Sequence, residues 1–514
     1  MKFLGKIDKT TVGTAVVIYL CIFLFIFLLP DTAANVVNSI VNLTTTSLGF
    51  VYILAYAFIL FVFLFIGFSK YGKLRLGKDD DRPEFSFFSW MGMLFGAGLG
   101  VGLVFYGVYE PVSHYMTAPF AESGTAAAAA DAMRITFFHW SFLPWALYGM
   151  IGLCIGYFLH KKGMPGLVSS TFEPMLGDKI YKTPGKMINS FSLIALICGV
   201  AMSLGFAGTQ LMSGLNSQFG VPNTFASIAI VVIVIGIAST LSAISGVEKG
   251  IKVISDSNMY LVIFLMVFVL CFGSTSKLIS FFFESLGGLF AELPFMMFFM
   301  DSLGTVQDKL GFNWTGDWTI MYWAWWVAFA PFVGGFLASI SKGRTIREFV
   351  IATVAVPGVL CCLWFVLFGG EGIFMDLNQG KEIGAAVVAN VDNSLFVFLN
   401  ELPFSVATII IAMLLILTLI ITSVNSATFV AGQFSADGDS TPGLGIRAFW
   451  GIFIVVNAIA FIYIGGLDTL KGTAIVMAFP FIIISVLMVV NLLMELKKTS
   501  IPAETAKASK TKSK

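Results

Sequence analysis

The sequence predicts an all-α polytopic membrane protein with twelve transmembrane helices. Of its 514 residues, 58% are hydrophobic and only 11% are charged, and the mean hydropathy is +0.91. Apolar runs of about 18 or more residues, long enough to cross a bilayer, recur from residue 11 almost to residue 494. Lysine and arginine gather on one side of these runs, as is typical of multi-pass proteins.

We predict membrane spans over residues 11–30, 48–69, 87–110, 132–160, 189–215, 222–244, 253–274, 318–341, 346–368, 404–434, 444–465 and 471–495. The first run is too long, and the second follows it too closely, for a cleaved signal peptide. The spans form one membrane domain over residues 11–495, with a tail at 1–10 and a short basic tail at 496–514.

The orientation follows from the basic residues. If the N-terminus lies in the cytoplasm, the cytoplasmic segments and the span ends beside them hold 25 of the 30 lysines and arginines. Both termini are therefore predicted to be cytoplasmic. No basic patch with interleaved aromatic residues suggests nucleic-acid binding.

All six cysteines fall inside apolar spans, and none has metal-ligand spacing with a histidine. We therefore expect buried thiols rather than disulfides or a metal centre.

The outer stretch 278–299 is amphipathic, and on a helix Glu284 and Glu292 would share one face. We expect a helix that lies along the outer membrane surface.

The third span contains the run FGAGLGVG, with glycines at 96, 98, 100 and 102. Each glycine weakens a helix by about 1 kcal/mol relative to alanine, so this span is expected to unwind locally. Unwound backbone inside a membrane lines a cavity or is buried, and its free carbonyls can ligate a cation. The alternative is close helix packing, because Gly92, Gly96 and Gly100 form two GxxxG steps.

The fourth span contains HWSFLPWALY at 139–148, in which Trp140, Trp145 and Tyr148 share an arc of about 140° on a regular helix. Pro144 should bend the helix between the two tryptophans. Because the cluster lies well inside its span, an internal aromatic site competes with the usual interfacial belt of tryptophans. We expect His139, as a lone histidine within a span, to be a hydrogen-bonded packing residue rather than a ligand.

The eighth span begins MYWAWWVAFAPF at 321–332, and Pro331 and Gly334–Gly335 are expected to interrupt it. Trp323, Trp326 and Phe329 are spaced three apart and should climb one side of the helix, while Trp325 points elsewhere. Two facing aromatic walls would form a cage for a quaternary ammonium ion, whose charge is spread over methyl groups that ring faces attract. A metal ion or a simple amine would need carboxylates, and Glu110 and Asp256 fall near span ends.

The tenth span contains ITSVNSATF at 421–429, where the adjacent hydroxyls of Thr422 and Ser423 could ligate sodium together with backbone oxygens of the glycine run. The commoner role of such hydroxyls is a hydrogen bond to the preceding turn of their own helix.

Together these stretches resemble the betaine–choline–carnitine transporter family. The matching residues are GAGLGVGLVFYGVYEPVSHY (96–115), HWSFLPWALY (139–148), SGVEKGIKVISDSNM (245–259) and YWAWWVAFAPFVGGFLASISKGRTIREFV (322–350). The resemblance covers all twelve spans. It implies a leucine-transporter-type inverted five-plus-five repeat preceded by two extra helices, with repeats at about 87–274 and 318–495, and a homotrimer.

The resemblance also implies site residues. The substrate's trimethylammonium group would sit in an aromatic box of Trp140, Trp145, Tyr148 and Trp326, with Trp325 close by. Phe329 stands where many betaine carriers have another tryptophan, which leaves the substrate open. The coupling sodium would be held by Gly96, Leu99, Thr422 and Ser423, and Phe332 matches a residue implicated in a second sodium site.

The sequence therefore predicts a sodium-coupled plasma-membrane importer of glycine betaine or choline that works by alternating access and needs no cofactor. The alternative within transport is a sodium-independent exchanger. The retained Pro331–Val333 and Thr422–Ser423 patterns favour sodium coupling. An enzyme is excluded by the lack of an HExxH motif, of paired intramembrane aspartates and of a serine with a histidine partner.

Overall fold

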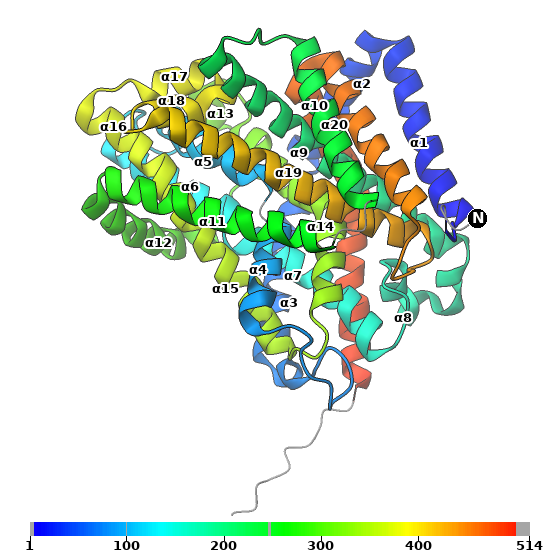
Figure 1. Cartoon of the computed structure of the whole chain (residues 1–514). Helices are drawn as coiled ribbons and strands as arrows, with labels where there is room; N and C mark the ends of the chain where they lie inside the picture. The colour runs from blue at the N-terminus through cyan, green and yellow to red at the C-terminus, as the bar shows by residue number, and fades with distance from the viewer. Residues whose placement is uncertain (1–4, 99, 245–247, 500–514) are drawn as a thin grey trace, which may run out of the picture.

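The computed structural model describes residues 5–98, 100–244 and 248–499. Within these ranges the regular secondary structure is helical, apart from one isolated β-bridge between Arg75 and Thr345. The helices are α1 (Lys9–Leu28), α2 (Pro30–Asn42), α3 (Gly49–Phe68), α4 (Phe87–Gly98), α5 (Val101–Met116), α6 (Ala126–Trp140), α7 (Phe142–Gly156), α8 (Glu173–Leu176), α9 (Thr183–Phe219), α10 (Phe225–Ile244), α11 (Glu248–Phe272), α12 (Thr275–Phe298), α13 (Thr305–Leu310), α14 (Met321–Ile340), α15 (Ile346–Phe365), α16 (Glu371–Gln379), α17 (Ile383–Ala389), α18 (Ser394–Asn400), α19 (Ser405–Ser435) and α20 (Leu444–Lys498) (Figure 1).

Short π-helical or 3₁₀ segments join several of them: η1 (Leu43–Ser47), η2 (Lys70–Lys73), η3 (Tyr157–Lys161), η4 (Ser169–Phe172), η5 (Gly177–Tyr181), η6 (Thr315–Ile320), η7 (Val366–Gly370) and η8 (Val391–Asn393).

Eleven helical stretches in the described residues are long and apolar enough to cross a membrane. Ten of them coincide with predicted spans. The predicted seventh span is represented by the shorter apolar stretch Ser257–Phe272. The eleventh stretch, Thr275–Phe298, is the helix predicted for the outer surface. It is present as a helix, but its length and composition also suit a span, so its surface position stays a prediction.

The predicted third span is two helices rather than one. α4 ends at Gly98 and α5 begins at Val101, and Gly100 between them has an extended backbone (φ −86°, ψ −179°). The glycine run therefore interrupts the helix, as predicted from the cumulative cost of its glycines.

The fourth span bends where Pro144 requires it. α6 ends at Trp140, Ser141 leaves the helical region (φ −90°, ψ −111°), and α7 starts at Phe142. A proline cannot donate to the carbonyl four residues earlier and its ring clashes with that carbonyl. The carbonyl in question belongs to Trp140, so the bend separates Trp140 from Trp145, as predicted.

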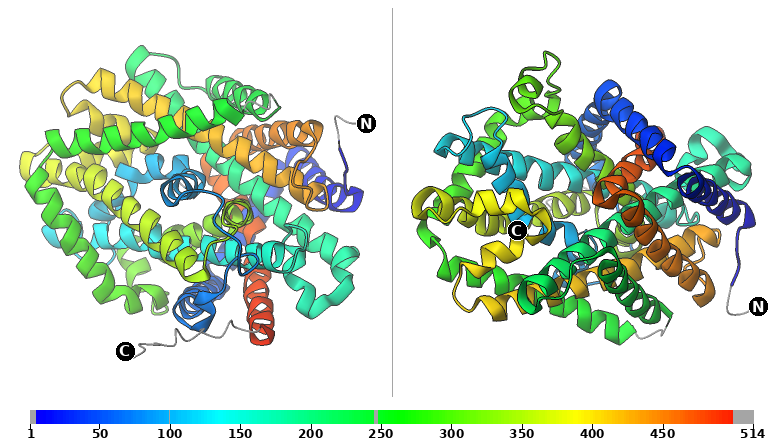
Figure 2. Two further views of the ribbon diagram at one scale, coloured as in Figure 1. Left: turned by 60° about the horizontal axis from the view of Figure 1, so that its bottom comes forward. Right: turned by 90° about the horizontal axis from the view of Figure 1, so that it is seen from above.

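The eighth span is not interrupted, and the prediction of a break at Pro331 and Gly334–Gly335 is wrong. α14 runs unbroken from Met321 to Ile340 with these residues inside it. The glycines serve close packing, because a Cβ on Gly334 would meet the side chain of Ile151 in α7. α14 packs against α7, α9 and α20 and lies at the centre of the molecule (Figures 1 and 2).

α20 contains two spans, Leu444–Ile464 and Lys471–Lys498. Gly466 between them has a φ of +66°, a backbone conformation open mainly to glycine. The chain changes direction at Gly466, so the two spans of α20, coloured orange and red in Figure 1, run along different axes.

The connection after α14 is tied to the connection before α4. Backbone N–H groups of Gly343 and Ile346 donate to the carbonyls of Leu76 and Leu74, at 2.6 and 2.8 Å. The guanidinium of Arg344 lies 4.5 Å from the ring centre of Trp90. These contacts fix one end of α14 beside the broken third span.

Candidate functional site

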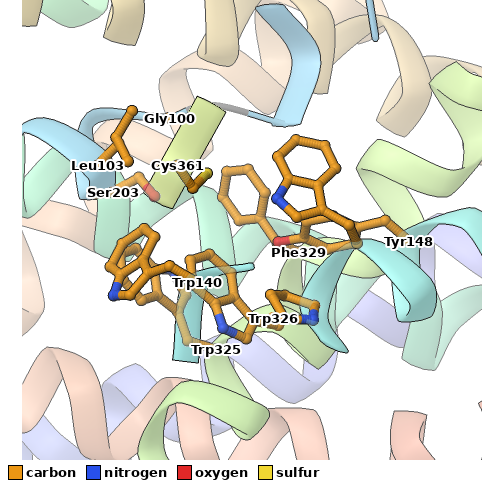
Figure 3. A pocket seen from close by; sticks show the side chains of 12 residues that line it. Gly100, Leu103, Trp140, Tyr148, Ser203, Trp325, Trp326, Phe329 and Cys361 are labelled. Atoms are coloured by element: carbon orange, nitrogen blue, oxygen red, sulfur yellow. The ribbon is translucent and has the colours of Figure 1, made fainter. Parts of the chain in front are cut away.

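One cavity is lined by all six aromatic residues predicted to bind substrate: Trp140, Trp145, Tyr148, Trp325, Trp326 and Phe329. The remaining lining comes from Gly100, Gly102, Leu103, Pro144, Ser203 and Cys361. Figure 3 shows Trp140, Trp325 and Trp326 gathered on one side of this pocket, with Gly100, Leu103 and Ser203 on another. The break in the third span and the bend in the fourth therefore meet at the same place. We call this set of six rings the cage.

The face of α14 that meets the cavity differs from the predicted one. Trp325, Trp326 and Phe329 line it, whereas Trp323 does not. Trp323 stacks on Tyr56 of α3, with ring centres 4.4 Å apart, and its carbonyl accepts a hydrogen bond from the Tyr56 hydroxyl at 2.9 Å. Trp323 therefore packs against α3, and Trp325 faces the cavity rather than pointing elsewhere.

The cage rings lie close to one another. Trp325 and Trp326 are stacked, with centres 4.9 Å apart and planes within 10°. Trp140 meets Trp326 edge-on at 4.8 Å, and Tyr148 stands perpendicular to Trp326 at 6.2 Å. The volume open to the centre of a water-sized sphere is about 20 Å³, little more than the ~10–15 Å³ that one water needs. A ligand with three methyl groups would have to spread these rings.

Hydrogen bonds orient two of the tryptophans. The indole N–H of Trp326 donates to the carbonyl of His139 at 3.2 Å, and that of Trp140 donates to Glu110 Oε2 at 2.5 Å. The Trp325 indole nitrogen and the Tyr148 hydroxyl are buried without a hydrogen-bond partner among the described residues. An unsatisfied buried polar group costs about 1–3 kcal/mol, so these two donors are suited to an acceptor on a ligand.

Gly102 places the α5 backbone directly against the cage. A Cβ built there would overlap the ring of Trp325 and lie 3.2 Å from Trp140 Cη2. We expect Gly102→Ala to displace both rings at a cost of about 1–3 kcal/mol, which raises the KM for the transported compound roughly tenfold or more. The matched control is Gly92→Ala in α4, where the added Cβ meets no atom within 4 Å. Equal KM values for the two variants would contradict this view of the cage wall.

Glu110 and His139 form a buried pair that no spacing in the sequence indicates. Glu110 was placed near the end of its span, but α5 continues to Met116 and the carboxyl group is fully buried. Glu110 Oε1 lies 2.7 Å from His139 Nδ1, and His139 Nε2 lies 2.9 Å from Thr319 Oγ1. The signal for this site in the sequence is an ionisable residue within a membrane helix, which usually has a functional role.

A second, larger cavity lies next to the cage, with about 530 Å³ open to the centre of a water-sized sphere. Its lining includes the charged side chains of Asp317, Asp468 and Lys471. Tyr106 also lines it, and the Tyr106 ring lies 5.7 Å from Trp140 and 5.8 Å from Trp325. We call this cavity the vestibule. Tyr106 thus lines the vestibule and packs against two rings of the cage.

The residues proposed for sodium are only partly described. Gly96 lies in α4 and Leu99 lies outside the described residues. Thr422 Oγ1 donates to the Thr418 carbonyl at 2.8 Å, which is the back-bonded arrangement considered as the alternative. Ser423 is buried on the same helix, α19, which packs against both α4 and α5. Phe332 is fully buried and packs edge-on against Phe329 at 5.4 Å.

The sequence model of the BCCT family, described as betaine/carnitine/choline family transporter, matches residues 10–501. The chain belongs to this family. It is accordingly a multi-pass membrane transporter and not an enzyme.

Relatives within the betaine/carnitine/choline family are similar over most of their length. The glycine betaine transporter OpuD of Bacillus subtilis (strain 168) is 42% identical over 470 residues, or 91% of this chain and 90% of the relative. A probable glycine betaine transporter of Desulfitobacterium hafniense (strain Y51) is 40% identical over 473 residues, or 91% and 93% of the two chains. Among solved structures, the crystal structure of MhsT in complex with L-phenylalanine matches with a TM-score of 0.48 and 13% identity, covering 80% of this chain and 89% of that one.

Proposed function

We propose that this protein imports a quaternary ammonium compound, glycine betaine or choline, across the plasma membrane by sodium-driven alternating access. The observation that carries the proposal is the cage, in which six aromatic side chains from α6, α7 and α14 surround one cavity. Ring faces attract a cation that lacks hydrogen-bond donors, and the attraction is strongest where water is excluded. The glycine betaine transporters named above support the same substrate class.

The two unpartnered donors of the cage fit the other end of such a ligand. Glycine betaine carries a carboxylate and choline a hydroxyl, and either could accept from the Trp325 indole or the Tyr148 hydroxyl. Phe329 keeps a ring face at the position where a tryptophan is common in the family.

Sodium coupling rests on the placement of α19 beside the interrupted third span. The hydrogen bond from Thr422 to the Thr418 carbonyl uses the hydroxyl hydrogen and leaves oxygen lone pairs for a cation. Asn258 Nδ2 donates one long hydrogen bond, of 3.4 Å, to the same oxygen. Back-bonding and sodium ligation by Thr422 are therefore compatible. Cytoplasmic termini, from the distribution of basic residues, and a homotrimer, from the family, complete the proposal.

Uptake into proteoliposomes tests it. We expect concentrative uptake of labelled glycine betaine or choline only with an inward sodium gradient. Uptake that ignores sodium but accelerates with preloaded substrate would instead identify an exchanger. Uptake of neither compound would reject the substrate class.

A further inference from the structure

Glu110 is a fully buried carboxyl group that the proposed cage and sodium site do not use. Its Oε2 accepts hydrogen bonds from the Trp140 indole N–H and the Tyr322 hydroxyl, both at 2.5 Å. Its Oε1 faces His139 Nδ1 at 2.7 Å and lies 3.6 Å from His114 Nε2. One side chain of α5 thus holds groups from α6 and α14 together.

Both donors to Oε2 control the cage rings. Trp140 is itself a cage wall. Tyr322 stacks on Trp325 and on Trp326, with centres 6.3 and 6.0 Å apart and planes within 23° and 14°. Through these two hydrogen bonds Glu110 fixes three of the six cage rings.

The chemistry of the donors explains why this group is a carboxylate. The Trp140 indole N–H and the Tyr322 hydroxyl both donate to Oε2. Hydrogen bonds to an ionised acceptor are roughly twice as strong as neutral ones, so these two donors favour the ionised form of the carboxyl group over the neutral form. Burying a carboxylate without such partners would be very costly. Oε2 is also the oxygen bonded to a cage ring, Trp140, while the imidazole of His139 bonds to the other oxygen. The negative end of the Glu110–His139 pair therefore faces the site proposed for the cation.

The same side chains could be considered as a metal site, because ligand atoms of Glu110, His114 and His139 lie within 4.8 Å of one another. A metal ion bound through Oε2 would have to displace the Trp140 and Tyr322 hydrogen bonds. Because both groups donate to Oε2, the contacts of Glu110 favour orientation of the cage rings over binding of a metal ion.

We propose that Glu110 is a positioning and specificity-determining residue of the quaternary ammonium site. It fixes Trp140 and the Tyr322–Trp325–Trp326 stack, and it places a negative charge behind the rings that selects a cationic headgroup. This inference rests on the proposed function.

The test compares each ligand with its uncharged-headgroup isostere. Purified full-length protein in nanodiscs is titrated, by tryptophan fluorescence, with glycine betaine and with tert-butylacetate, in which carbon replaces the nitrogen. Choline is paired with 3,3-dimethylbutanol in the same way. Glu110→Gln removes the charge and keeps the shape. We expect this variant to bind the ammonium ligand at least tenfold more weakly than the wild type does, and to bind the isostere with an affinity within about threefold of the wild-type value. The ratio of the two affinities should therefore fall.

The matched control is Glu371→Gln. Glu371 is also a buried carboxyl group, but it is held by the backbone N–H of Ser274, at 2.8 Å, and not by a residue of the cage. This variant should discriminate between ligand and isostere as the wild type does.

The outcomes separate the two proposals. If the wild type binds glycine betaine or choline but Glu110→Gln discriminates equally well, or loses both ligands alike, the selective role of Glu110 is overturned and the proposed function stands. If the wild type binds neither ammonium compound, the proposed function is wrong and this inference is wrong with it.

If Glu110→Gln does not accumulate in cells, Tyr322→Phe tests whether Glu110 positions the cage rings, because this variant keeps the ring and removes one hydrogen bond to Oε2. A severalfold loss of ammonium affinity supports the proposal, and unchanged affinity overturns it.

Discussion

Trp326→Ala is expected to raise the KM for glycine betaine or choline at least about thirtyfold. Trp326 is the ring that contacts most of the cage, since it stacks on Trp325, meets Trp140 edge-on and faces Tyr148. A desolvated cation–π contact is worth about 2 kcal/mol, which corresponds to this factor, and the neighbouring rings lose their support as well. Initial rates of labelled uptake over a range of substrate concentrations measure the effect.

Trp323→Ala is the control for this change. The substitution removes the same kind of side chain from the same helix, three residues earlier. Trp323 is also buried, but it packs on Tyr56 and does not line the cavity. We expect this variant to lose stability by about 3–5 kcal/mol and to keep its KM within about threefold. Equal rises in KM would show that the cage does not bind the substrate.

The double variant Thr422→Ala, Ser423→Ala is expected to abolish the dependence of uptake on sodium. Substrate and sodium that share one binding equilibrium must tighten each other by the same factor. In the wild type, sodium should therefore lower the substrate KM, and in the double variant the ratio of KM values without and with sodium should fall to about one.

Thr418→Ala controls for the loss of a hydroxyl on the same helix. Thr418 lies one turn earlier on α19 and donates in the same way to its own helix, to the Leu414 carbonyl at 2.7 Å. Its substitution should leave the sodium response intact. A double variant that still responds to the sodium gradient would return both hydroxyls to ordinary helix hydrogen bonding.

Much of the site could be predicted because local rules decide it. The bend before Pro144 and the interruption at Gly98–Val101 follow from missing donors and from the cost of glycine, and the structure has both. The choice between Trp323 and Trp325 could not be made this way. All three tryptophans of α14 are buried, so helical spacing shows which rings share a side but not which side meets the cavity.

Two further differences have the same origin in tertiary packing. Gly334 has the sequence signal of a helix break, yet it allows α7 to approach closely. Glu110 marks an apparent span end because hydropathy falls there, while in the fold indole, phenol and imidazole groups from two other helices satisfy its oxygens. A hydropathy profile cannot show that a polar side chain has internal partners.

The position of Tyr106 has a consequence for rates. Its ring is the contact shared by the cage and the vestibule, and its buried hydroxyl has no hydrogen-bond partner among the described residues. No hydrogen bond of that hydroxyl would need to break for the ring to turn aside. We therefore expect affinity and access to depend on different residues: the cage decides how tightly a compound is held, and rotation of the Tyr106 ring decides how fast the compound passes between the vestibule and the cage. A carrier built in this way can evolve faster or slower turnover without changing what it recognises.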